Sequence, residues 1–120
     1  MIRSIICGLC LTAAIWPAPG HSQPYSDSMA DCTGLALAAA HHLQTPDRKA
    51  FAEQTAAMWI DAAIAQAKSE GRTTAEAQMA ARADATRAAW LEDGVMMPFS
   101  ENFRDWTSYC RKFGRAQGVF

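Results

Sequence analysis

The sequence contains four cysteines, and the spacing between them indicates which chemistry each could perform. Cys7 and Cys10 form a C-x-x-C pair, which is the spacing of redox dithiols and of half a zinc site. Both lie in an apolar run near the start of the chain with no βαβ pattern around them, so we assign them to a targeting segment. Cys32 and Cys110 remain, and neither has a C-x-x-C partner. We therefore expect these two to form a structural disulfide without redox activity.

Histidine and methionine side chains offer a second chemistry. His41 and His42 are adjacent, and Met96 and Met97 form another adjacent pair. Copper accepts both ligand types, and thioether sulfur selects Cu(I), so these residues permit an exported copper-binding protein. Against this, adjacent side chains on a helix point about 100° apart, and histidines in a last helical turn interact favourably with the helix dipole without a metal. Copper binding stays the alternative function, and we expect no cofactor.

The residues that catalysis requires are not grouped in this sequence. It lacks G-x-S-x-G, H-E-x-x-H, a phosphate-binding glycine loop and the C-x-x-C-H of attached haem. Its carboxylates are spread along polar faces near basic residues, as on a solvated helix surface; examples are Asp61, Glu76, Asp84 and Glu92. We expect no enzymatic activity.

The first 22 residues have the order of a secretory signal peptide. Arg3 supplies a positive charge, Ile5–Trp16 is an almost unbroken apolar run, and small residues follow. The run is shorter than the roughly 20 residues that cross a bilayer as a helix, so we expect no permanent membrane anchor. Cleavage fits after Gly20 or after Ser22, and we favour Ser22. The remaining residues, 23–120, are expected to form one helical domain in the periplasm or outside the cell.

The charge pattern bears on the type of partner. The chain has 11 basic and 12 acidic residues. No basic stripe is present that would neutralise a row of phosphates, so we expect no nucleic-acid partner. Arg111, Lys112 and Arg115 are close together near the C-terminus, where cations favour the last turn of a helix.

Apolar periodicity predicts four helices, over residues 27–43, 46–69, 74–93 and 100–113, and no strand. Each has terminal signals typical of helices. The expected starts are Ser26 or Ser28, Thr45 followed by Pro46, a capping box from Thr73 to Glu76, and Ser100. The expected ends are the Gln44-Thr45-Pro46 break, Gly71, Gly94 and Gly114.

Four helices with short connections favour an up-down-up-down bundle, so the predicted fold is a small all-α bundle. In that topology Cys32, early in the first helix, and Cys110, late in the fourth, lie at the same end. Their disulfide would close a loop of about 78 residues and stabilise the domain by roughly 4 kcal/mol. A domain of this size needs such support because it buries under about 70% of its unfolded surface.

The opposite end of the bundle is the expected binding surface. It would hold the segment 95–99, VMMPF, which either plugs the bundle or forms an exposed apolar patch for a partner. Ile60 and Ile64, on a second apolar stripe of the 46–69 helix, belong either to the core or to a further interface. The candidate contact residues are Val95, Met96, Met97, Phe99, Ile60 and Ile64. We therefore expect a non-catalytic interaction protein, namely an accessory subunit, an inhibitor or immunity-type protein or a chaperone-like binder, whose partner is another envelope or secreted protein.

Overall fold

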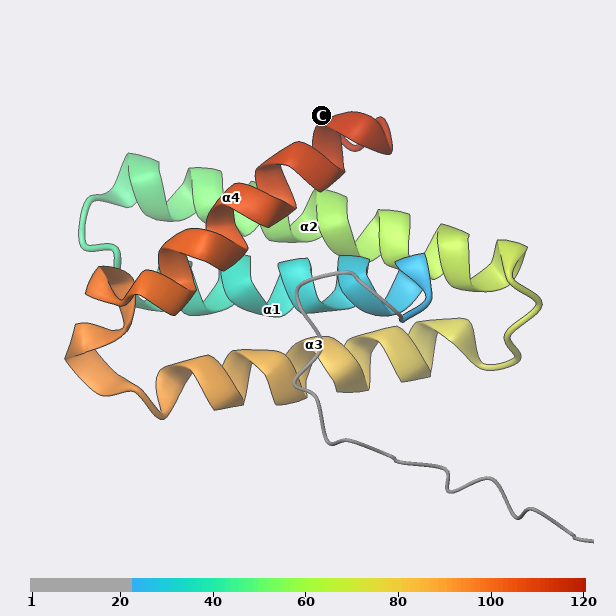
Figure 1. Cartoon of the computed structure of the whole chain (residues 1–120), viewed down its shortest axis with the longest axis horizontal. Coiled ribbons are helices and arrows are strands. Elements are labelled where there is room, and N and C mark those ends of the chain that lie inside the picture. Colours follow the sequence, from blue (N-terminus) through green and yellow to red (C-terminus); the bar gives the residue numbers. More distant parts are fainter. Residues whose placement is uncertain (1–22) are drawn as a thin grey trace, which may run out of the picture.

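The computed structural model describes residues 23–120, which form helices connected by short turns (Figure 1). In chain order the helices are α1 (Tyr25–His42), α2 (Pro46–Ser69), α3 (Ala75–Leu91), the 3-10 helix η1 (Gly94–Phe99) and α4 (Glu101–Ala116). No strand occurs in this range, so the all-α prediction is confirmed. None of these helices has both the length and the apolar character that a membrane span requires. The predicted signal peptide, residues 1–22, lies outside the described residues.

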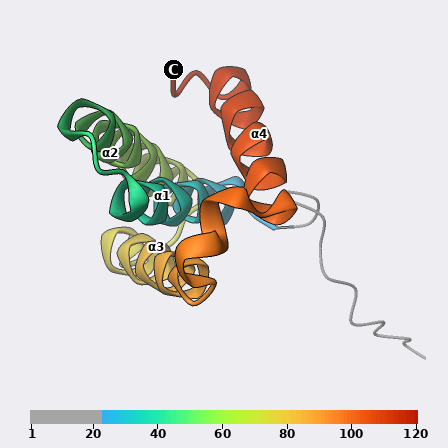
Figure 2. The ribbon, with the colours of Figure 1, turned by 90° about the vertical axis from the view of Figure 1, so that its left-hand side faces the viewer.

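α1 is the middle helix of a layer, with α2 on one side and α3 on the other (Figures 1 and 2). Ala30, Gly34 and Ala38 of α1 follow one another at intervals of four residues and are all buried. A Cβ atom at Gly34 would lie 2.6 Å from the carbonyl oxygen of Ala83 and 2.7 Å from Cβ of Thr86, both on α3. The close contact between α1 and α3 therefore depends on the missing side chain of glycine.

Many buried residues are alanines, so a few large side chains must fill the space between the helices. Trp59, Met79 and Met97 are at most 1% exposed, and Leu35 and Trp90 are also buried. These side chains supply most of the apolar area that folding removes from water.

Two arginines bind the two acidic residues of α1. Arg72 lies in the turn before α3 and Arg82 lies on α3, so both bonds help to position α3 along α1. Arg72 donates from Nη1 and Nη2 to the carboxylate of Asp27 at 2.8 and 3.0 Å. Arg82 donates from Nε and Nη2 to the carboxylate of Asp31, also at 2.8 and 3.0 Å. Thr86 adds a hydrogen bond of 2.9 Å to Asp31. These bonds raise the pKa of both guanidinium groups, and two-point pairing fixes orientation as well as distance.

Glu70 joins the end of α2 to the start of α1. Its carboxylate accepts hydrogen bonds from the backbone N–H and hydroxyl of Ser26 and, at 3.0 Å, from the side-chain amide of Gln66. Burial raises the pKa of Glu70, but these hydrogen bonds and the charge of Arg72 outweigh burial, so the pKa lies below its ordinary value.

α4 crosses α1 obliquely, whereas the sequence predicted four helices side by side (Figures 1 and 2). Two aromatic contacts account for this. Phe103 in the first half of α4 meets Trp90 of α3 edge to face, and Phe113 in the second half stacks on Trp59 of α2, each with ring centroids 5.9 Å apart. A helix that contacts α3 at one end and α2 at the other must cross α1, which lies between them.

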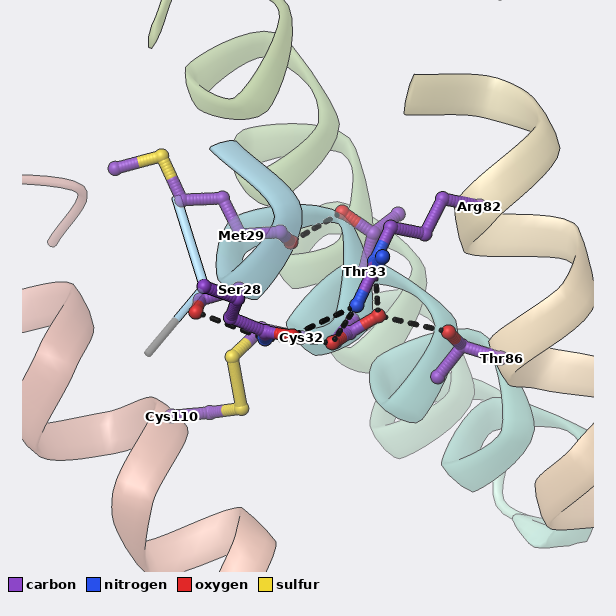
Figure 3. The surroundings of a disulfide bond; sticks show 9 residues. Ser28, Met29, Cys32, Thr33, Arg82, Thr86 and Cys110 are labelled. Atoms are coloured by element: carbon purple, nitrogen blue, oxygen red, sulfur yellow. Dashed lines mark hydrogen bonds and ion pairs between the residues drawn. A yellow bond between two sulfur atoms is a disulfide. The ribbon is translucent and has the colours of Figure 1, made fainter. Parts of the chain in front are cut away.

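The disulfide between Cys32 and Cys110 joins α1 to α4 at this crossing (Figure 3), with their Cα atoms 5.7 Å apart. Cys32 was expected early in the first helix and Cys110 in the last turn of the fourth, but both lie farther inside, because α1 begins at Tyr25 and α4 continues to Ala116. It closes a loop with a sequence separation of 78 residues, which stabilises the folded chain by roughly 4 kcal/mol.

Two of the predicted helix starts are wrong. Ser26 and Ser28 cap nothing, because α1 already begins at Tyr25 and buries both serines. The capping box from Thr73 to Glu76 does not form, because the N-cap position belongs to Thr74, which has φ 55° and no capping hydrogen bond from its side chain.

The remaining terminal signals agree with the structure, apart from Thr45 and Gly114. Thr45 occupies the N-cap position of α2, but its side chain makes no capping hydrogen bond. Pro46 is the first residue of α2, and the hydroxyl of Ser100 accepts a 3.1 Å hydrogen bond from the N–H of Phe103. Gly71 and Gly94 have φ values of 82° and 65° just beyond the ends of α2 and α3. Positive φ is the conformation that glycine adopts readily after a helix.

Gly114 does not end α4 but lies buried inside it. A Cβ atom there would approach Phe120 and would lie 2.9 Å from the indole of Trp59. The chain turns at Gly118, whose φ is 72°, and the N–H of Val119 donates to the carbonyl of Gly114 at 2.8 Å. This turn folds Phe120 back onto Trp59, with ring centroids 5.5 Å apart.

Candidate functional site

The segment 95–99 is partly core and partly surface. η1 has about three residues per turn, so residues three apart share a face. Met97 points inward and is 0% exposed, whereas Val95, Met96 and Phe99 are 79%, 65% and 74% exposed. We call these three exposed residues the tip. The prediction that Met97 belongs to the contact surface is therefore wrong, because its side chain anchors η1 in the core.

The four candidate copper ligands differ in their exposure to solvent. His41 and Met96 are exposed, but Met97 is buried and His42 is half-buried. The two imidazole rings are nearly perpendicular, with centroids 5.3 Å apart, and Nε2 of His42 is enclosed with no hydrogen-bond partner. Within residues 23–120, no three side chains of the types His, Cys, Asp and Glu come together as a metal site would require.

Ile60 and Ile64 lie on α2, half-buried against the hydrophobic core. They therefore act as outer core residues, and they do not form the exposed apolar face that a separate interface needs.

A second apolar surface, which the sequence did not reveal, is a groove of about 590 Å³ between α1, α2 and α4. Its floor is the face of α1 that carries the disulfide, and its two walls come from the first half of α2 and from α4. Its exposed large side chains are Phe51 (71%), Met58 and Phe120. The groove residues are Cys32, Leu35, Ala36 and Ala39 of α1; Phe51, Ala52, Thr55, Met58 and Trp59 of α2; Phe103, Thr107, Cys110, Arg111 and Arg115 of α4; and Phe120.

The groove exists because α4 is inclined. Aromatic contacts hold the second half of α4 against Trp59, while the first half of α4 lies over the end of α3. Figure 1 shows the first half of α2 and the start of α4 diverging from each other across α1. A fourth helix alongside α2 would have filled this space with its own side chains.

The polar groups of the groove all lie on the α4 wall, apart from Thr55, whose hydroxyl bonds to the carbonyl of Phe51. The hydroxyl of Thr107 is buried and has no hydrogen-bond partner within residues 23–120. Among the residues that the structure describes, neither Arg111 nor Arg115 forms an ion pair, and no acidic residue lines the groove.

The residues of this groove stand out in the sequence, but when each helix is considered alone their pattern does not indicate a groove. Phe51 and Met58 fall on one apolar face of α2, and a helix that is apolar on more than one side can be either central or at an interface. Arg111 and Arg115 were expected to stabilise the end of a helix, but only Arg115 lies in the last turn of α4. Among the described residues, the groove lining contains no histidine, no acidic side chain and no free thiol.

These two surfaces, the tip and the groove, are the candidate functional sites of the described residues. No protein-family model, curated protein or solved structure matches this chain.

Proposed function

We propose that this protein is an exported, non-catalytic interaction module that binds another envelope or secreted protein through its tip. The observation that carries the proposal is the exposure of Val95, Met96 and Phe99, at 79%, 65% and 74%, on one six-residue segment. Grouped apolar side chains that remain in water usually mark a surface that a partner covers. Methionine suits such a surface because its flexible side chain adapts to the partner's shape.

The tip is held rigidly, which favours binding. Met97 anchors η1 in the core, and the hydroxyl of Ser100 donates to the carbonyl of Met97 at 3.0 Å while it caps α4. A surface that is already ordered before binding loses less conformational entropy in the complex. The three tip side chains therefore project from a fixed backbone.

Two features support export. The residue order of 1–22 is that of a signal peptide, and the Cys32–Cys110 disulfide persists in oxidising compartments such as the periplasm.

The proposal is tested by photo-crosslinking in the native host. A benzoylphenylalanine replaces Met96 or Phe99 in the tip, and matched controls carry it at Ala57 of α2 or Ala81 of α3, which are also exposed. We expect one adduct of the same mass from both tip positions and none from the controls. Tip positions that give no adduct, or the same adducts from all four positions, would contradict the proposal.

A further inference from the structure

The polarity of the groove changes along its length. On the α4 wall, Phe103, Thr107, Arg111 and Arg115 follow at intervals of four residues and therefore lie on one helix face. The side chains change from aromatic to hydroxyl to guanidinium over roughly 18 Å of helix. Apolar side chains of the other two helices, such as Ala39 of α1 and Phe51 of α2, line the groove together with Phe103.

From this gradient, we propose that the groove binds a free fatty acid, a single acyl chain with a carboxylate. The acyl chain lies on the floor of α1 and extends toward Phe51 and Phe103. The carboxylate accepts hydrogen bonds from Arg111 and Arg115. This goes beyond the proposed function, because it uses a surface other than the tip and a small molecule in place of a protein.

The charges identify an anionic ligand. Two guanidinium groups on one wall form no ion pair among residues 23–120, and the lining contains no acidic side chain. Arginine binds carboxylates through two parallel hydrogen bonds. The hydroxyl of Thr107 lies one turn before Arg111, and it is enclosed without a hydrogen-bond partner among residues 23–120.

The size and shape of the groove favour a small molecule over a protein segment. Its volume of about 590 Å³ lies within the range of roughly 300–1,000 Å³ that is typical of small-molecule sites. It is lined from three sides, and Phe120 packs against Trp59 beside Arg115. Few convergent polar groups in an otherwise apolar cleft are the usual composition of such a site.

Calorimetric titration of the purified, oxidised protein with monomeric dodecanoate tests the proposal. We expect saturable binding to one site, and an affinity that rises about fourfold for each methylene added between octanoate and dodecanoate. Dodecyltrimethylammonium has the same tail with a cationic head, and we expect it to bind at least about tenfold more weakly.

A pair of charge variants tests the head-group contact. Arg111→Gln with Arg115→Gln should weaken dodecanoate binding roughly tenfold, because each exposed charged pair contributes a few-fold. The control, Arg104→Gln with Lys112→Gln, removes two positive charges from the same helix outside the groove and should leave the affinity unchanged. The head-group comparison on the unaltered protein still decides the question if the groove variant does not fold.

Three results would overturn the proposal: no saturable binding of dodecanoate, equal binding of the cationic amphiphile, or equal loss in both charge variants. Vesicles of phosphatidylglycerol distinguish a membrane surface from a free acyl chain. Capture by vesicles that depends on Arg111 and Arg115, without binding of monomeric dodecanoate, would also refute the proposal. None of these outcomes bears on crosslinking at the tip.

Discussion

Gly34→Ala is a sharp test of how α1 and α3 pack, because two effects of opposite sign act at this position. Alanine is about 1 kcal/mol more favourable than glycine in a helix interior, so helix propensity alone predicts a more stable protein. The added methyl group, however, would lie 2.6 Å from the carbonyl oxygen of Ala83 and 2.9 Å from the backbone nitrogen of Arg87. These are backbone atoms, so no side-chain rotation relieves the overlap.

The helices must therefore move apart, and this strains the packing on both sides. Inserting a methyl group into a tightly packed contact costs about 1–3 kcal/mol. Separation also stretches the hydrogen bonds from Arg82 and Thr86 to Asp31, which connect the same two helices. After the gain in propensity of about 1 kcal/mol is subtracted, we expect Gly34→Ala to give no gain in stability and to lower the free energy of unfolding by up to about 2 kcal/mol.

Urea unfolding followed by far-ultraviolet circular dichroism measures this difference in unfolding free energy. The comparison requires that the slope of the free energy against urea concentration is the same for the variant and the parent. Ala81→Gly, on the exposed face of α3, is the calibration: it should cost about 1 kcal/mol from propensity alone. If Gly34→Ala proved more stable than the parent by the amount that Ala81→Gly loses, the close contact between α1 and α3 would be refuted.

Three further predictions concern stability. Met97→Ala should lower the free energy of unfolding by about 2–5 kcal/mol, whereas Met96→Ala should change it by less than about 0.5 kcal/mol. Equal urea midpoints for the two variants would contradict the inward position of Met97. Replacing Cys32 and Cys110 by serine together should cost roughly 4 kcal/mol, and an unchanged midpoint would show that the bond does not constrain the chain. The pKa of Glu70 is lowered in the folded state, so its stabilisation is present above the unfolded pKa and is lost as pH falls through the folded pKa. Thermal melts should therefore show the parent losing more stability on acidification than Glu70→Gln, and parallel losses would be the contrary result.

The extents of the helices could be predicted from the sequence because their signals are local. Pro46 starts α2, and Gly71 and Gly94 adopt positive φ just beyond two helix ends, as expected of residues whose backbone preferences hold in any context. The caps of α1 and α3 were less predictable. Ser26, for example, donates to Glu70, which is 44 residues away in the sequence, and no local pattern reports that contact.

The inclination of α4 could not be predicted from helix faces alone. Periodicity showed that Phe103 and Phe113 share a face of α4, but not that one meets Trp90 and the other Trp59 on different helices. The groove was missed for the same reason, since it results from that inclination. The tip was partly predicted: the sequence indicated residues 95–99, but the division between buried Met97 and its exposed neighbours follows from the 3-10 geometry of η1.

We propose that this chain is exported, and the Cys32–Cys110 disulfide holds α4 across α1 and thereby positions the tip and the groove. The most direct test is non-reducing peptide mapping by mass spectrometry, after thiol alkylation, of the protein recovered from its own host. We expect one linked pair of peptides containing Cys32 and Cys110, in a chain that begins after Gly20 or Ser22. Alkylated thiols at both cysteines, or residues 1–22 still attached, would contradict it.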